Sequence, residues 1–233
     1  MRLATRVANK FLQWDGYTDT SLLDAKIAAL ADGKPQAQAT DLIHTAWNTR
    51  KSIDLSGIVY GPETTSGKYL NTTPNYYYFL AGFVRSQHCK RILEIGTNFG
   101  GASLAMVKAG AEKIVTIDVT DVNQALYSVP QITKLTGDAN NEGVFKRALV
   151  EMGTEPIDLL FLDADHRFMP TMMNFALYSM SLRPTFILLD DIHRNDSMQS
   201  LWDAMRIIRK AVDCVDIIPE IRSKDCGFGL IIC

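Results

Sequence analysis

The sequence lacks the features that mark membrane-spanning, secreted, zinc-binding and nucleic-acid-binding proteins. No apolar run approaches the roughly 20 residues that a helix needs to cross a bilayer, and the N-terminal residues have no apolar core like that of a signal peptide. The four cysteines show neither CxxC nor CxxH spacing, so we expect reduced thiols rather than disulfides or zinc. A net charge of −2 gives no electrostatic case for nucleic acid. We therefore expect a cytoplasmic protein.

The length of 233 residues suits one large α/β domain with an appendage. Residues 20–32 and 39–52 have helical apolar spacing, while residues 55–75 are rich in Gly, Pro, Thr and Ser and predict a loop. We therefore predict an N-terminal helical extension over residues 1–75 and a main domain over residues 76–233.

From residue 91 onward, short apolar segments alternate with segments of helical spacing. The predicted strands are 91–95, 113–118, 131–135, 157–162 and 185–190, and the predicted helices lie near 101–109, 121–127, 142–152, 169–181 and 196–212. This alternation predicts a parallel sheet covered by helices on both faces. Two last strands, near 214–219 and 227–232, predict an antiparallel pair. The expected fold class is α/β, a Rossmann-like doubly wound seven-stranded mostly parallel sheet with an antiparallel C-terminal edge strand and an N-terminal helical extension.

The first predicted strand and the helix after it are joined by a glycine turn, in the sequence RILEIGTNFGGAS. Gly96, Gly100 and Gly101 allow a ligand to approach the backbone closely, and the turn leads into a helix N-terminus that favours a carboxylate or phosphate. A dinucleotide-binding turn would read GxGxxG. Here Asn98 stands at the middle glycine and Glu94 lies inside the strand, which disfavours NAD. The turn predicts a nucleotide or a nucleoside-bearing cofactor.

Acidic residues recur where the predicted strands end. Because ligands of open parallel sheets bind beyond the carboxyl ends of the strands, we expect these side chains at one site. Any one aspartate is explained by a turn or a helix N-cap, but a purely structural sheet needs no such series at one edge. The residues are Asp118, Asp138, Asp163, Asp165, His166, Asp190 and Asp191.

In their order and spacing, five motifs resemble those of the class I S-adenosylmethionine (SAM) dependent methyltransferases. More narrowly, they resemble metal-dependent O-methyltransferases related to catechol O-methyltransferase and to bacterial natural-product and sugar O-methyltransferases. The motifs are LEIGTNFGGAS (93–103), TIDVT (116–120), GDA (137–139), FLDADH (161–166) and LLDDIH (188–193). The resemblance covers roughly residues 70–233. It implies an enzyme that uses SAM to methylate a hydroxyl of a small molecule, such as a phenol or catechol, a sugar or a natural product.

The resemblance also implies roles for individual residues in holding SAM. The glycine turn would hold the methionine part of SAM, Asp118 the two ribose hydroxyls and Asp138 the adenine amino group. A turn role is an equal alternative for Asp138. The implied cofactor-binding residues are Glu94, Gly96, Asn98, Gly100, Gly101, Ser103, Asp118, Asp138 and Asp163.

Asp163, Asp190 and Asp191 match the metal-ligand positions of the resembled family, and their hard oxygen ligands suit Mg²⁺, with Mn²⁺ or Ca²⁺ as alternatives. Catechol-type enzymes usually have an Asn where Asp191 stands, so the site here carries one more negative charge. A metal-free acidic pocket is the alternative. His166 stands where those enzymes have a lysine base and titrates near neutrality, so we predict that it deprotonates the acceptor hydroxyl. His193 is the competing base.

Several alternatives stay open from the sequence. Asp165 would either orient His166 or complete the shell of the metal. The chain as a whole would alternatively be a catalytically inactive SAM-binding partner protein or a metal-independent methyltransferase. N-terminal helical arms often pack against a second subunit, so we expect a homodimer or higher homo-oligomer, with no nucleic-acid or membrane partner.

Overall fold

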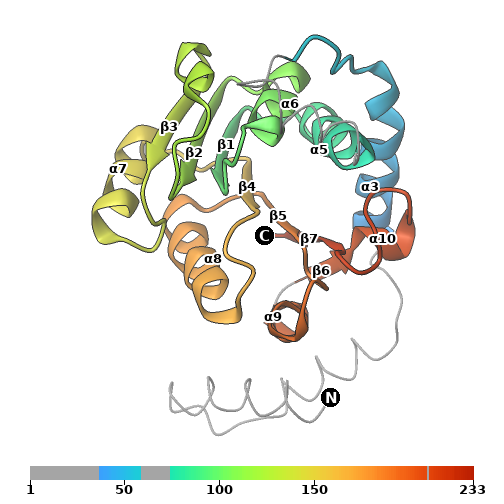
Figure 1. The fold of residues 1–233 in the computed structure, drawn as a ribbon. Helices are drawn as coiled ribbons and strands as arrows, with labels where there is room; N and C mark the ends of the chain where they lie inside the picture. The colour runs from blue at the N-terminus through green and yellow to red at the C-terminus, as the bar shows by residue number, and fades with distance from the viewer. Residues whose placement is uncertain (1–36, 59–73, 209) are drawn as a thin grey trace, which may run out of the picture.

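The computed structural model describes residues 37–58, 74–208 and 210–233 (Figure 1). The helix predicted over 20–32 and most of the loop predicted over 55–75 lie outside the described residues. The helices are α3 (Ala37–Thr49), η1 (Arg50–Ser52), α5 (Pro74–Ser86), α6 (Gly101–Ala109), η2 (Gln124–Ser128), α7 (Glu142–Met152), α8 (Phe168–Leu182), α9 (Asp196–Ile208) and α10 (Cys214–Ile217). The strands are β1 (Arg91–Ile95), β2 (Lys113–Asp118), β3 (Ile132–Thr136), β4 (Leu159–Leu162), β5 (Phe186–Asp190), β6 (Lys210–Asp213) and β7 (Phe228–Ile232). None of these helices is long and apolar enough to cross a membrane.

The strands form one seven-stranded sheet in the order β3-β2-β1-β4-β5-β7-β6. The strands from β3 to β5 in this order pair in parallel, and β7 is antiparallel to both of its neighbours. The predicted α/β, Rossmann-like, mostly parallel sheet is therefore confirmed. The antiparallel strand β7 lies one position in from the edge, which β6 forms.

Alternate side chains of the strands enter two apolar clusters, one on each face of the sheet. In β1, Ile92 belongs to the cluster that includes α3, α5 and α6, while Leu93 and Ile95 belong to the cluster that includes α7, α8 and α9 (Figure 1). Strands buried on both faces read as nearly continuous apolar runs, as these do. The prediction of helices on both faces is thus confirmed.

The predicted helix over 39–52 is present as α3 followed by η1. It packs closely on α5, because a Cβ at Gly82 would lie only 2.2 Å from the carbonyl oxygen of Ala46. Ile43 and Ala46 are fully buried and belong to the same apolar cluster as one face of the sheet. The division of the chain after residue 75 stays a prediction.

The C-terminal edge differs from the sequence prediction in where helix and strand change over. The helix predicted over 196–212 ends at Ile208, and β6 follows over Lys210–Asp213. Residues near 214–219, predicted as a strand, begin with the short helix α10. The antiparallel strand predicted near 227–232 is present as β7.

Asp213 sets the boundary between β6 and α10. Its side chain accepts a hydrogen bond of 2.9 Å from the backbone N–H of Val215, which is an N-cap contact. Val212, one residue before Asp213, pairs with Leu230 of β7. The apolar spacing of this stretch suits either kind of element. The cap and the strand pairing decide between them, and neither is visible in the periodicity.

The strand order reverses between β1 and β4, which lie side by side. In open parallel sheets this switch point is where ligands bind, beyond the carboxyl ends of the strands. The glycine turn follows β1 and Asp163 follows β4, and the backbone N–H of Asp163 bonds the carbonyl of Ile95 at 2.8 Å. The fold therefore brings two of the predicted motifs together.

Candidate functional site

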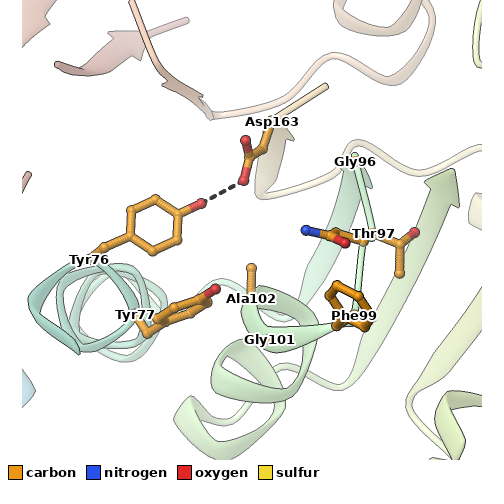
Figure 2. A pocket seen from close by; sticks show the side chains of 9 residues that line it. Tyr76, Tyr77, Gly96, Thr97, Phe99, Gly101, Ala102 and Asp163 are labelled. Carbon is orange, nitrogen blue, oxygen red and sulfur yellow. Dashed lines mark hydrogen bonds between the residues drawn. The ribbon is translucent and has the colours of Figure 1, made fainter. Parts of the chain in front are cut away.

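The glycine turn after β1 and the start of α5 form a pocket at the switch point (Figure 2). The residues that line it are Tyr76, Tyr77, Gly96, Thr97, Asn98, Phe99, Gly101, Ala102 and Asp163. Gly96 has a φ of +105°, and a Cβ there would lie 2.0 Å from the carbonyl oxygen of Asp163. A Cβ at Gly101 would lie 2.9 Å from the ring of Tyr77. Gly96 is therefore required for the close approach of the two strand ends, whereas at Gly101 a Cβ would force the ring of Tyr77 to move.

Helix α6 begins at this turn. Gly100 is the N-cap residue, with a φ of +82°, and no side chain caps the helix there. Asn98 also has a left-handed backbone, with a φ of +45°, a conformation that Asn tolerates better than most residues. The first N–H groups of a helix have no partner within it, so an uncapped N-terminus suits the carboxylate of a ligand.

Asp118 lies at the end of β2 and braces the glycine turn. Its Oδ2 accepts a hydrogen bond of 2.8 Å from the backbone N–H of Asn98, and its Oδ1 accepts bonds of 2.9 Å from the N–H and the hydroxyl of Thr120. A carboxylate has about four acceptor positions. Asp118 therefore keeps acceptor capacity beside the turn, where the ribose of SAM is predicted to bind.

Asp138 follows β3 and acts as a turn residue. Its side chain is exposed and accepts a hydrogen bond of 2.8 Å from the backbone N–H of Asn140. Asp138 is not among the residues that line the pocket at the glycine turn. Of the two interpretations of this residue, the turn role is visible, and contact with adenine stays a prediction.

Glu94 is fully buried in β1, beneath the glycine turn. Its Oε2 accepts hydrogen bonds from the hydroxyls of Ser103 and Thr116, the latter at 2.5 Å, whereas Oε1 has no partner in the described part of the chain. Burial raises the pKa of Glu94 to about 7, against the effect of the two hydroxyl bonds. A buried carboxylate with an unpartnered oxygen suits a cationic ligand group, such as the ammonium of an amino acid.

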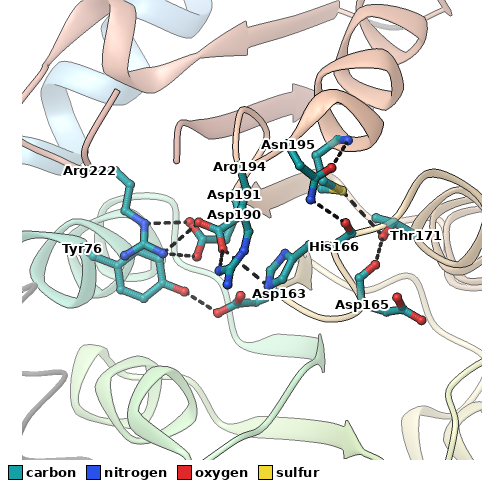
Figure 3. Close-up of polar contacts among 11 residues, drawn as sticks. Tyr76, Asp163, Asp165, His166, Thr171, Asp190, Asp191, Arg194, Asn195 and Arg222 are labelled. Atoms are coloured by element: carbon teal, nitrogen blue, oxygen red, sulfur yellow. Dashed lines mark hydrogen bonds and ion pairs between the residues drawn. The ribbon is translucent and has the colours of Figure 1, made fainter. Parts of the chain in front are cut away.

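Asp163, Asp190 and Asp191 gather at the ends of β4 and β5, where the sequence predicts a metal site (Figure 3). Arg222 reaches this cluster from the loop between α10 and β7. Its Nε and Nη2 donate to the two oxygens of Asp190 at 3.1 and 2.7 Å, and Nη2 also donates to Oδ1 of Asp191 at 3.0 Å. Arg194 donates from Nη1 to Oδ2 of Asp191 at 2.6 Å. Two cations therefore lie among the three acids.

Tyr76 joins the pocket to the acidic cluster. Its hydroxyl donates a hydrogen bond of 2.8 Å to Oδ2 of Asp163 (Figure 2), and the guanidinium of Arg222 lies 4.8 Å from the centre of its ring. Sequence reasoning missed both residues. Tyr76 is buried, and a buried aromatic residue on a helix is explained by core packing when the sequence alone is considered. Arg222 lies in a loop without any motif, so no sequence signal points to it.

The pKa values of the acids diverge according to their neighbours. Burial raises the pKa of Asp163 to about 7, with the charge of Asp191 adding to the effect and the bond from Tyr76 opposing it. Burial and the charge of Asp163 also raise the pKa of Asp190. Asp191 is different, because the bond from Arg194 and the charge of Arg222 outweigh burial and lower its pKa. Asp191 is thus the acid most firmly held as a carboxylate.

His166 has the properties of a general base, and His193 does not. His166 Nε2 lies 3.4 Å from Oδ2 of Asp191, and burial lowers the pKa of His166, so its imidazole is neutral at neutral pH. Both ring nitrogens of His193 are occupied, Nδ1 by Gln199 at 2.6 Å and Nε2 by Asp213 at 2.7 Å. His193 therefore has no nitrogen free for a substrate within this arrangement.

The exposed carboxylate of Asp165 does neither of the things that the sequence suggests for it. It forms an ion pair with Arg167, with N–O distances of 2.5 and 2.6 Å. It neither orients His166 nor joins the three acids. Its φ of +45° is in the left-handed region, as is that of Asp191 at +56°, so the backbone is strained at two places in the loops that carry the acids.

A divalent metal does not fit the acid cluster as it stands. In residues 37–58, 74–208 and 210–233, no group of three or more His, Cys, Asp or Glu side chains is arranged to hold a metal ion. Arginine nitrogens already contact every carboxylate oxygen of Asp190 and Asp191.

Comparisons with known proteins agree with this fold. No protein-family model matches the chain, and no curated protein matches its sequence. Among solved structures, an O-methyltransferase from Bacillus cereus in complex with SAH is similar, with 17% identity, a TM-score of 0.51, and coverage of 82% of this chain and 100% of that one. The O-methyltransferase TomG from Streptomyces achromogenes, involved in tomaymycin synthesis and solved with SAM, is 16% identical over 76% of this chain and 92% of that one, with a TM-score of 0.49. The likeness to the Bacillus cereus structure shows that the chain has a Rossmann-like fold of the kind found in that O-methyltransferase.

Proposed function

We propose that the protein is a SAM-dependent O-methyltransferase that acts on a hydroxyl group of a small molecule. The observation that carries this proposal is the bond between Asp118 and the backbone N–H of Asn98, 2.8 Å long. It fixes the acid at the end of β2 against the glycine turn, beside the uncapped N-terminus of α6. An acceptor for a hydroxyl thus stands against the turn that lines the pocket, and donors for a carboxylate stand at the start of α6, as a nucleoside joined to an amino acid requires.

The residues present fit SAM on features of the chain itself. The N-terminus of α6 would hold the carboxylate of its methionine part, the buried carboxylate of Glu94 its ammonium, and Asp118 its ribose. Gly96 and Gly101 keep the pocket open, because a Cβ on either would meet Asp163 or Tyr77. When bound, SAM supplies an electrophilic methyl group on a positively charged sulfur.

The acceptor would bind on the side of the site where His166 lies. His166 is the residue that takes the proton from the acceptor hydroxyl, because its lowered pKa leaves it neutral and able to accept. His166 Nε2 lies 3.4 Å from Oδ2 of Asp191. The tautomer with its hydrogen on Nε2 would face this carboxylate and leave Nδ1 to receive the proton. The hydrogen bond between Tyr76 and Asp163 fixes two side chains that line the pocket, and positioning of the reactants supplies most of the rate gain in a direct transfer.

The test is methyl transfer from SAM labelled in its methyl group, offered to catechols, simple phenols, sugars and hydroxylated natural products. We expect label in at least one class of acceptor, and His166→Ala to lose that transfer while still binding S-adenosylhomocysteine. A protein that binds S-adenosylhomocysteine and labels none of these acceptors would favour the inactive SAM-binding partner instead. A folded protein that binds neither SAM nor its product would overturn the proposal.

A further inference from the structure

Every carboxylate oxygen of Asp190 and Asp191 is in contact with an arginine. Arg222 contacts both oxygens of Asp190 and Oδ1 of Asp191, and Arg194 contacts Oδ2 of Asp191. The Asp190 contact uses two nitrogens on two oxygens, the forked geometry in which guanidinium and carboxylate pair most strongly. Both oxygens of Asp190 and of Asp191 therefore already bind an arginine and are not available to coordinate a metal ion.

The guanidinium of Arg222 is largely buried from solvent. The side chains of Asp190 and Asp191 are each 2% exposed, and that of Arg222 is 16% exposed. Two adjacent carboxylates at this depth need a compensating cation, because an unpaired buried charge is strongly destabilising. The guanidinium of Arg222 stays protonated throughout the pH range in which proteins fold. The compensating cation is therefore permanent.

Arg222 is also fixed in position and keeps donors to spare. The ring of Tyr76 lies against its guanidinium at 4.8 Å, a cation–π contact. Within the described part of the chain, the hydrogen bonds of Arg222 use Nε and Nη2. A guanidinium has five N–H groups, so the two on Nη1 are left for a ligand.

We propose that Arg222, supported by Arg194, takes the place of a divalent cation in this site, so that the protein binds its acceptor without metal. This inference rests on the proposed function, since the oxygen that Arg222 would bind is that of the methyl acceptor. The guanidinium groups of Arg222 and Arg194 together balance the charges of Asp190 and Asp191. Arg222 also offers N–H donors to an acceptor oxygen that is losing its proton to His166.

The test is a calorimetric titration of Mn²⁺ and of Mg²⁺ into the metal-stripped full chain, for wild type and Arg222→Gln. We expect wild type to show no saturable binding below about 1 mM. Arg222→Gln should bind Mn²⁺ at least about tenfold more tightly, because its acids have lost their cation. The double variant Arg222→Gln/Asp190→Asn should lose that gain, which assigns the new binding to the acid pair.

Two outcomes would overturn the inference. One is saturable Mn²⁺ binding by wild type below about 1 mM that Asp190→Asn abolishes. The other is a folded Arg222→Gln protein that binds Mn²⁺ no better than wild type. The wild-type titration decides the matter even if Arg222→Gln does not fold. Because no arm depends on methyl transfer, failure of this inference is distinguishable from failure of the proposed function.

Discussion

The hydroxyl of Tyr76 and the carboxylate of Asp163 are joined by a hydrogen bond of 2.8 Å, between a helix that precedes the sheet and the end of β4. This bond lowers the pKa of Asp163 against a larger rise from burial. It also holds the ring of Tyr76 beside Arg222. One side chain therefore links the pocket at the glycine turn to the acids at the neighbouring strand ends.

Tyr76→Phe tests this link. The substitution keeps the ring and removes the bond, so we expect the free energy of unfolding to fall by about 1–3 kcal/mol, the cost of leaving a buried acceptor of this kind unsatisfied. Urea unfolding at pH 7.5 measures the change. Tyr127→Phe is the matched control, because it removes a longer and exposed bond of 3.2 Å to Asp121. Equal effects of the two substitutions would contradict the link.

Gly96→Ala tests the close approach of β1 and β4. Gly110 has nearly the same φ, +109° against +105°, but a Cβ there meets nothing within 4 Å. Gly110→Ala should therefore cost only the backbone strain, about 1–2 kcal/mol. Gly96→Ala should cost about 1–3 kcal/mol more, because the new methyl group overpacks against the backbone of Asp163.

The same pair of variants also tests the pocket. Gly96→Ala should weaken binding of S-adenosylhomocysteine, since the turn must shift to admit the methyl group, whereas Gly110→Ala should leave it unchanged. Thermal unfolding and calorimetry on both variants measure the two effects. Indistinguishable behaviour of the two variants would show that the turn does not hold the ligand.

Glu94 makes stability depend on pH. Burial raises its pKa from 4.5 to about 7, so between these values the folded protein binds a proton that the unfolded chain has lost. The free energy of unfolding therefore falls as pH rises from about 4.5 to about 7, by up to about 3 kcal/mol from this group. Asp163, with its pKa also raised to about 7, contributes with the same sign.

Glu94→Gln should flatten this dependence, because a buried amide cannot titrate. Urea unfolding at pH 5 and pH 7.5 should show a smaller loss of stability in Glu94→Gln than in wild type. The exposed Glu151 on α7 supplies the control, and Glu151→Gln should keep the wild-type slope. An unchanged slope in Glu94→Gln would mean that Glu94 is not the titrating group.

If His166 is the base, its protonation sets how the rate of methyl transfer depends on pH. A base works when it is unprotonated, and burial lowers the pKa of His166 below its ordinary value. The rate should therefore rise with pH on the acid side and be level by about pH 7. His166→Ala should lose about 100-fold or more in rate, while the exposed His88, replaced as His88→Asn, should change nothing. A wild-type rate that still rises steeply above pH 7 would point to another base.

Local patterns were enough to place most of the fold. The bounds predicted for β1, β2, α6 and α7 are those observed, because apolar runs, glycines and caps are all near in sequence to the elements that they define. The helix predicted over 121–127 is instead the 3₁₀ helix η2, which begins after the side chain of Asn123 caps the N–H of Ala125. The exchange of helix for strand at 210–217 depends on pairing with β7, which is not a local property.

The residues of the candidate site also differ in whether local sequence patterns could predict them. The acids and the glycine turn belong to strand ends, so a parallel sheet brings them together once its order is known. Arg222 and Tyr76 reach the site from a loop and a helix that are distant in sequence, and only tertiary packing places them there. The metal site predicted from Asp163, Asp190 and Asp191 rested on the resemblance to metal-dependent O-methyltransferases and on the oxygen ligands of these acids. Arg222, which pairs with two of them, had no signal in the sequence.

Calorimetric titration of S-adenosylhomocysteine into the purified protein tests the claim that this pocket binds SAM. We expect saturable one-to-one binding in the micromolar range, strongly weakened in Asp118→Ala because the carboxylate that faces the turn is gone. Absence of binding by wild-type protein that circular dichroism shows to be folded would contradict the claim.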